Sequence, residues 1–217
     1  AEVDQTPPSV TAFDISHTHA RAGTPIKVTI TASEDQDEAA GYPRLKLAGQ
    51  PRGMTATGKA RQYAATVTPD GDEGDGPKPV VIELLDGAGN FANEVVGSVS
   101  YDFRPPGIVD GSAKVQLVPA ETNVLQSVQA VTAGTKVLVS FIVDEELSQP
   151  PGVSAHSPDE ETPEPLLFEL ESSSEPRYVY ALTVEGRDHD QGAYWIEVSA
   201  TDMAGNPDPA SPIELPV

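Results

Sequence analysis

The side chains in this chain that could do chemistry are mostly carboxylates. There are 34 Asp and Glu against 13 Lys and Arg, which gives a formal net charge of −21. Seven acids stand in groups or at positions where an ion could bind: Asp70, Asp72, Asp75, Asp102, Asp144, Glu145 and Asp202. Calcium suits such acids because it takes about 6 to 8 oxygen ligands. The same charge makes nucleic acid and anionic membrane surfaces poor partners.

Two simpler interpretations compete with calcium binding. The loop acids could be only solvated, as is usual on an acidic surface. Asp86 and Asp202 each open a D-x-A-G-N sequence, where Asp can accept backbone hydrogen bonds two residues on and so cap a turn. We favour capping for these two. The stretch 70–75 begins like an EF-hand loop, but its sixth position is Asp75 and its twelfth is Val81 instead of Glu, so that motif is rejected.

The histidines do not form an evident catalytic or metal site. His17 and His19 would lie on one side of an extended segment, but no third ligand is near in sequence, which favours a loop or strand-edge pair. We expect His156 and His189 in polar loops. Motifs of a nucleophile elbow, a phosphate-binding loop or a zinc peptidase are absent from the sequence. We therefore predict that the chain is not an enzyme.

Trp195, the only tryptophan, falls on the parity opposite Tyr194, Ile196 and Val198. If those three face a core, Trp195 faces outward. It could then stack on a sugar ring, or it could cover the contact between domains or the long acidic loop 148–165. As a ligand-binding residue it is a weak candidate, because a single aromatic makes a poor platform.

Short alternating segments surround these residues. Ile26 to Ala32 and Val137 to Val143 have the period of two of a strand with one buried face. Further candidate strands are Tyr63 to Val67, Tyr180 to Val184, Arg44 to Ala48 and Leu166 to Leu170. With 18 Gly and 21 Pro and no sustained helical period, the fold class is all-β.

The sequence repeats itself. D-x-A-G-N occurs at 86 and 202 (202 − 86 = 116), A-G-T at 22 and 133 (133 − 22 = 111), and D-x-x-P-P at 4 and 102 (102 − 4 = 98). Along the chain this offset grows from 98 to 111 to 116, which places insertions in loops of the second copy. We predict two tandem domains, residues 1–103 and 104–217, each of a size that suits one small sandwich.

These motifs together resemble the bacterial immunoglobulin-like (Big-type) repeats of large surface and secreted proteins. The resemblance implies an Ig-like Greek-key β-sandwich of seven strands in each unit, joined end to end, with calcium at the junctions in several branches. It also implies an extracellular or cell-envelope location, at the surface, the outer membrane or the periplasm. The chain begins without Met or a signal peptide, so we expect a segment of a longer protein.

Loop placement in such a sandwich predicts where the acids meet. The loop that carries Asp70, Asp72 and Asp75 would point to the C-terminal end of unit 1, toward Asp102. The loops that carry Asp144, Glu145 and Asp202 would point to the N-terminal end of unit 2. We therefore expect these seven acids to converge at the domain junction, where calcium would neutralise them and stiffen the hinge.

The sequence thus predicts a non-catalytic spacer or adhesion module with Ca²⁺ as its only expected cofactor. Its expected partners are neighbouring repeats of the same chain and a cell-surface protein or carbohydrate, and we expect a monomer. No apolar run approaches the roughly 18 residues needed for a membrane span. The alternative function is a carbohydrate- or protein-binding accessory module beside a catalytic domain.

Overall fold

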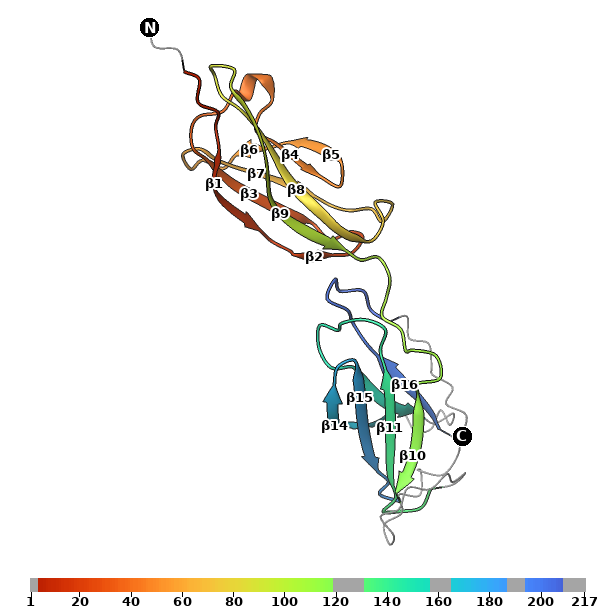
Figure 1. Cartoon of the computed structure of the whole chain (residues 1–217). Helices are drawn as coiled ribbons and strands as arrows, with labels where there is room; N and C mark the ends of the chain where they lie inside the picture. Colours follow the sequence, from red (N-terminus) through yellow and green to blue (C-terminus); the bar gives the residue numbers. More distant parts are fainter. Residues whose placement is uncertain (1–3, 119–130, 157–164, 187–193, 209–217) are drawn as a thin grey trace. The chain divides into compact units, whose positions relative to one another are not determined.

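The computed structural model describes residues 4–118, 131–156, 165–186 and 194–208. The chain forms two compact units, Ala1–Phe103 and Arg104–Val217 (Figure 1). In the described ranges no helix is long and apolar enough to cross a membrane. His189 lies outside the described residues, as do residues 157–164 of the long acidic loop.

Unit 1 is a sandwich of two sheets with a single turn of 3-10 helix, η1 (Glu38–Ala40), among its described residues. One sheet has the order β1-β3-β7-β6 and the other the order β2-β9-β8-β4-β5. The strands are β1 (Val10–Ile15), β2 (His19–Ala20), β3 (Ile26–Ala32), β4 (Arg44–Leu47), β5 (Gln50–Gly53), β6 (Thr55–Ala56), β7 (Gln62–Val67), β8 (Gly76–Leu85) and β9 (Phe91–Tyr101).

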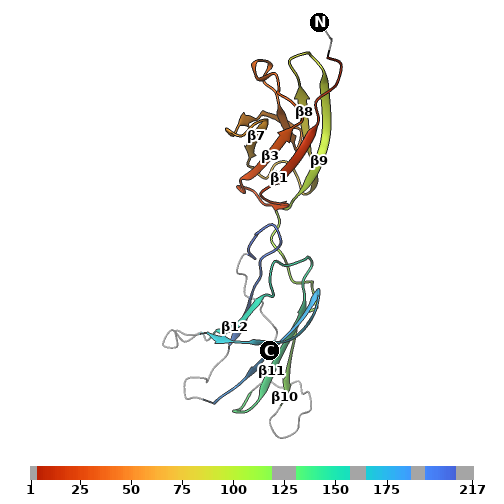
Figure 2. The ribbon, with the colours of Figure 1, turned by 90° about the vertical axis from the view of Figure 1, so that its left-hand side faces the viewer.

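The first strand of unit 1 is divided between the two sheets. β1 pairs antiparallel with β3, and after a short crossing β2 pairs parallel with the end of β9. Figure 2 shows β1 beside β3 on one side and the long β8–β9 pair on the other. Together with the sheet orders, this arrangement is that of an Ig-like sandwich, as predicted.

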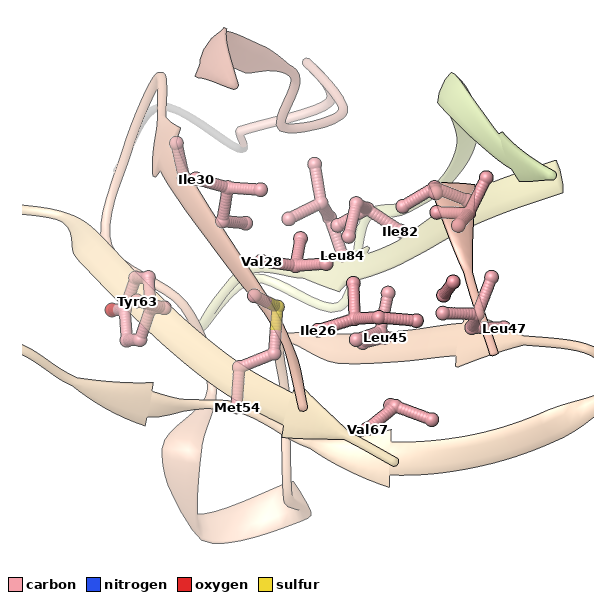
Figure 3. Packing of buried hydrophobic residues seen from close by; sticks show 14 of the residues in the cluster. Ile26, Val28, Ile30, Leu45, Leu47, Met54, Tyr63, Val67, Ile82 and Leu84 are labelled. Atoms are coloured by element: carbon pink, nitrogen blue, oxygen red, sulfur yellow. The ribbon is translucent and has the colours of Figure 1, made fainter. Parts of the chain in front are cut away.

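The core of unit 1 lies between the sheets. β3 buries Ile26, Val28 and Ile30 against the inner residues of β4 and β8, and Figure 3 shows these side chains interleaved with Tyr63 and Met54. The predicted period of two for β3 is confirmed. Close packing reaches the edge of the core: a Cβ on Gly97 would lie 2.9 Å from the Phe13 ring, so only glycine leaves room for that ring.

Unit 2 has two described sheets, of order β10-β11-β15-β14 and β13-β12-β16. The strands are β10 (Lys114–Val118), β11 (Lys136–Ile142), β12 (Gly152–His156), β13 (Leu166–Leu167), β14 (Glu169–Ser174), β15 (Arg177–Thr183) and β16 (Trp195–Ser199). Phe141 and Tyr178 are among its most buried side chains. The four-stranded sheet has the same sequence-order pattern as β1-β3-β7-β6.

Two local predictions for unit 2 are wrong. Leu166 to Leu170 is not one strand, because the chain changes sheets at the buried Phe168, whose N–H donates to Val153 O at 2.9 Å. The sequence shows one continuous hydrophobic run here, because the buried Phe168 lies between the two strands. His156 is not in a polar loop but ends β12, directly opposite Trp195 of β16.

Candidate metal centre

Three carboxylates converge at one end of unit 1. Asp4 precedes β1, Glu34 follows β3 and Asp86 follows β8, and each offers an oxygen within 4.8 Å of the others. Gln36 holds two of these loops together, because its Nε2 donates to Glu34 O at 3.1 Å and its Oε1 accepts from Leu85 N at 3.1 Å. The site is therefore built from three segments that are far apart in sequence.

Asp86 is the buried anchor of this group and is 3% exposed. Its Oδ1 accepts the N–H groups of Ala88 and Asn90, both at 2.8 Å, and its Oδ2 accepts Asn90 Nδ2 at 2.7 Å. Burial opposes ionisation of Asp86, but these hydrogen bonds outweigh it and lower its pKa. The predicted turn cap is confirmed, and Asp86 is held ionised beside the other two acids.

Glu34 and Asp4 complete the group with less support. Asp4 Oδ1 accepts from Thr6 N at 3.0 Å, and the backbone O of Asp4 accepts Asn90 Nδ2 at 3.3 Å, which ties the entering segment to the D-x-A-G-N turn. Burial and then the negative charges of Asp4 and Asp86 raise the pKa of Glu34. The group therefore carries the mutual repulsion that a bound cation would relieve.

The offsets of the sequence repeat relate these three acids to three later ones. The offset of 116 takes Asp86 to Asp202, 111 takes Glu34 to Glu145, and 98 takes Asp4 to Asp102. Asp202 is 1% exposed and accepts Asn206 N at 2.8 Å and Asn206 Nδ2 at 2.7 Å, and it offers an oxygen within 4.8 Å of one of Glu145. Leu147 forms an isolated antiparallel β-bridge with Asp202, as Gln36 does with Asp86.

The acids of the loop 70–75 mainly accept hydrogen bonds from backbone N–H groups of the same loop. Glu73 accepts the N–H groups of Asp70 at 3.3 Å and Gly71 at 3.1 Å, while Asp70 Oδ1 accepts Asp72 N at 3.0 Å. Asp75 Oδ1 accepts Phe103 N at 3.0 Å. These acids are not part of the three-carboxylate group in unit 1. Their role as calcium ligands stays a prediction.

The remaining two predicted ligands are fixed by backbone contacts. Asp144 Oδ1 accepts Gly107 N at 2.7 Å, and a Cβ on Gly107 would lie 2.9 Å from Asp144 Oδ2. The backbone N–H of Asp102 donates to Ala20 O at 3.0 Å, at the end of β2. The sequence reasoning missed Asp4 and Glu34, although the repeat offsets already related them to Asp102 and Glu145.

The histidines are bound to neighbouring side chains. Nδ1 of His17 lies 2.9 Å from Ser16 Oγ, and Nδ1 of His19 lies 3.3 Å from Thr18 Oγ1. Neither belongs to a three-ligand group among the residues that the structure describes. This fits the strand-edge interpretation.

Trp195 lies on the outer face of its sheet, as its parity predicted, and is 38% exposed. Its ring stacks on His156 at 5.6 Å and 14°. His156 Nε2 lies 2.9 Å from Ser154 Oγ and 3.6 Å from Glu197 Oε2. A Ser-His-acid relay needs the acid and the serine on opposite ring nitrogens, so this trio lacks that geometry.

Comparisons with known proteins assign no family. No family model matches the chain, and no curated protein matches it. Among solved structures it is similar to the fibronectin(III)-like modules of CbhA from Clostridium thermocellum, with 14% identity, a TM-score of 0.35, and coverage of 94% of this chain and 90% of that chain. The fold assignment therefore rests on the strand order of each unit.

Proposed function

We propose that this chain is a pair of non-catalytic Big-type repeat domains from an extracellular or cell-envelope protein, acting as a spacer or adhesion module that binds calcium. The observation that carries the proposal is the recurrence of the same three acids in both copies of the sequence repeat, with the first three brought within 4.8 Å of one another. Turn capping alone explains Asp86, but it does not explain why the carboxylates of Glu34 and Asp4 lie beside it.

The chemistry of the group favours calcium over other cations. All three side chains are hard oxygen donors, and no cysteine is present in the sequence. Calcium tolerates irregular sites and completes its shell with carbonyls and water, while Mg²⁺ requires near-octahedral geometry. Capping and ligation are compatible, because a carboxylate has about four lone-pair sites and Asp86 uses three for its hydrogen bonds with Ala88 and Asn90.

A bound ion would attach each unit to the segment that precedes it. Asp4 lies in the segment before β1, and its counterpart Asp102 lies in the segment that joins the units. The mechanism proposed is therefore mechanical: calcium turns a repelling acidic end into a cross-link and stabilises each domain by mass action, by about 2.7 kcal/mol at a hundredfold excess over Kd.

A calorimetric titration with CaCl₂ and MgCl₂ tests this proposal on the full chain. We expect two calcium ions per chain, with Kd on the order of 10⁻⁴ M or tighter, and one fewer in either Glu34→Gln or Glu145→Gln. Glu169→Gln, at an exposed position of β14 outside these acidic groups, is the matched control and should leave two ions bound. Absence of saturable binding at millimolar calcium, or two ions in both Gln variants, would refute the proposal.

A second candidate function is a carbohydrate-binding accessory module. It is favoured by the exposed Trp195, flanked on the same face by Ser154 and Glu197 as hydrogen-bonding groups. Affinity electrophoresis in gels that contain soluble polysaccharides tests it. Retardation that Trp195→Ala abolishes would support sugar binding, and unchanged mobility across neutral and acidic polysaccharides would contradict it.

A further inference from the structure

The larger sheet of unit 1 has an outer face whose side chains form three rows across the strands. Register places Lys46 opposite Val81 and Val81 opposite Val95, in the first row. The second row is Arg44, Glu83 and Asn93, and the third contains Leu85 and Phe91. The alternate residues Leu45, Ile82 and Leu84 are fully buried in the core, so these three rows point away from it.

The outer face is unusually apolar for the surface of an acidic chain. Val95 is 70% exposed and Phe91 50% exposed, while Val81 and Leu85 beside them are half-buried. Figure 1 shows β8 and β9 running side by side over this length. Apolar side chains that gather on a flat, uncovered sheet are typical of an interaction surface.

Arg44 is fixed in place on this face. Its Cζ lies 4.3 Å from the centroid of the Tyr42 ring, its Nε donates to Gly41 O at 3.1 Å and its Nη2 donates to Ala40 O at 3.0 Å. Tyr42 in turn meets Phe91 edge-on at 6.2 Å. The guanidinium is thus preorganised, and its Nη1 has no partner among the described residues.

Glu83 is the complementary group. It lies directly opposite Arg44 in the register and is half-buried, yet its side chain makes no hydrogen bond or ion pair with any residue that the structure describes. Arg44 is turned instead toward the carbonyls of Ala40 and Gly41. The middle row therefore carries one cation and one anion side by side, and the two side chains do not pair with each other.

We infer that the outer face of β4, β8 and β9 binds the same face of a second copy of this chain. A two-fold axis parallel to the strands and midway between β4 and β8 would place Arg44 of each copy over Glu83 of the other. Lys46 of each copy would then lie over Val81 of the other. The charged row is self-complementary about this axis and has apolar side chains in the rows on both sides, so one surface supplies both halves of an isologous interface.

The same features argue against a sugar as the occupant. Arg44 covers one face of the Tyr42 ring, the Tyr42 and Phe91 rings meet at 81° with their centroids 6.2 Å apart, and the most exposed apolar member of the face, Val95, is aliphatic. Stacking on sugars needs open aromatic faces. Three strands at about 4.8 Å spacing give a face roughly 14 Å wide. A face this narrow buries less area than a standard interface, which predicts a weak dimer.

Sedimentation equilibrium on the full chain, at about 0.15 M salt and from roughly 1 to 500 µM, tests this inference. We expect a monomer–dimer equilibrium with Kd on the order of 10–100 µM, in place of the monomer expected from sequence. Glu83→Arg alone and Arg44→Glu alone should each weaken it at least about tenfold, because both place like charges in contact twice. An equimolar mixture of these two variants should restore dimers, since every pair across the axis is again of opposite charge.

The controls separate this interface from a general charge effect or misfolding. Glu169→Arg on β14 makes the same charge change in unit 2 and should leave Kd unaltered. Val95→Arg tests the apolar row without touching Arg44, and should also weaken association at least about tenfold. A wild type that stays monomeric to 500 µM, a dimer that survives Glu83→Arg, or a mixture that fails to associate would each overturn the inference.

Discussion

At the scale of single residues, two buried tyrosines differ in one hydrogen bond. Tyr101 is 1% exposed and its hydroxyl has no hydrogen-bond partner among the described residues, whereas the hydroxyl of Tyr180 donates to Pro151 O. An unsatisfied buried hydroxyl costs free energy that its removal recovers. Tyr101→Phe should therefore raise the free energy of unfolding of unit 1 by about 1 kcal/mol, and Tyr180→Phe should lower that of unit 2 by about 1–2 kcal/mol.

Urea unfolding separates these two effects. The only tryptophan, Trp195, reports unit 2 by fluorescence, and circular dichroism reports both units. If both variants were destabilised equally, the orphaned hydroxyl of Tyr101 would be without consequence.

The same tyrosines set the alkaline limit of stability. Burial, with Glu73 nearby, raises the pKa of Tyr101 to about 12, and burial with Tyr178 nearby raises the pKa of Tyr180 to about 12. A folded-state pKa above the ordinary value of 10 means that stability is complete below pH 10 and falls as the pH rises toward 12. Melting temperatures measured from pH 8 to 12 should decline above pH 10, and the double variant Tyr101→Phe, Tyr180→Phe should decline less.

For Glu34→Gln, calcium should reverse the sign of the change in melting temperature. Because its pKa is raised in the folded state, ionisation of Glu34 opposes folding, and this cost sets in as the pH rises past the ordinary carboxyl range. Without calcium, Glu34→Gln should melt at the wild-type temperature or higher at pH 7. With calcium in excess, it should melt lower, because a ligand is lost. A variant that melts lower in both conditions would show that Glu34 has only a structural role.

At the scale of elements, the D-x-A-G-N turn closes the strand that precedes it in each unit. Asp202 accepts two hydrogen bonds from Asn206 while 1% exposed, so Asp202→Ala leaves buried donors unpaired. We expect a loss of about 2–3 kcal/mol from unit 2. Fluorescence-detected unfolding measures it, and Asp72→Ala, at an exposed position, should change stability by less than about 0.5 kcal/mol. A negligible effect of Asp202→Ala would exclude the capping role.

The elements also show what the sequence could predict. Strict alternation placed β3 and β11, and the parity of Trp195 gave its outward direction, because local periodicity decides which face is buried. The change of sheet at Phe168 could not be predicted, since a single apolar run contributes residues to strands of both sheets. The site in unit 1 was missed because Asp4, Glu34 and Asp86 meet only through tertiary structure.

At the scale of the whole molecule, the chain is a tandem repeat, and each copy of the sequence repeat carries the same acid trio. Calcium binding and self-association of the outer face use different residues, so either can hold without the other. Calcium should stabilise both units, and Glu34→Gln and Glu145→Gln should each remove that stabilisation from its own unit alone.

The most direct test of the central claim is anomalous diffraction from crystals grown in calcium. We predict an anomalous peak in unit 1 at about 2.3–2.6 Å from oxygens of Asp4, Glu34 and Asp86. The same crystals should show an ion bound by Glu145 and Asp202 in unit 2. Ordered carboxylates with no anomalous peak between them at saturating calcium would contradict the account.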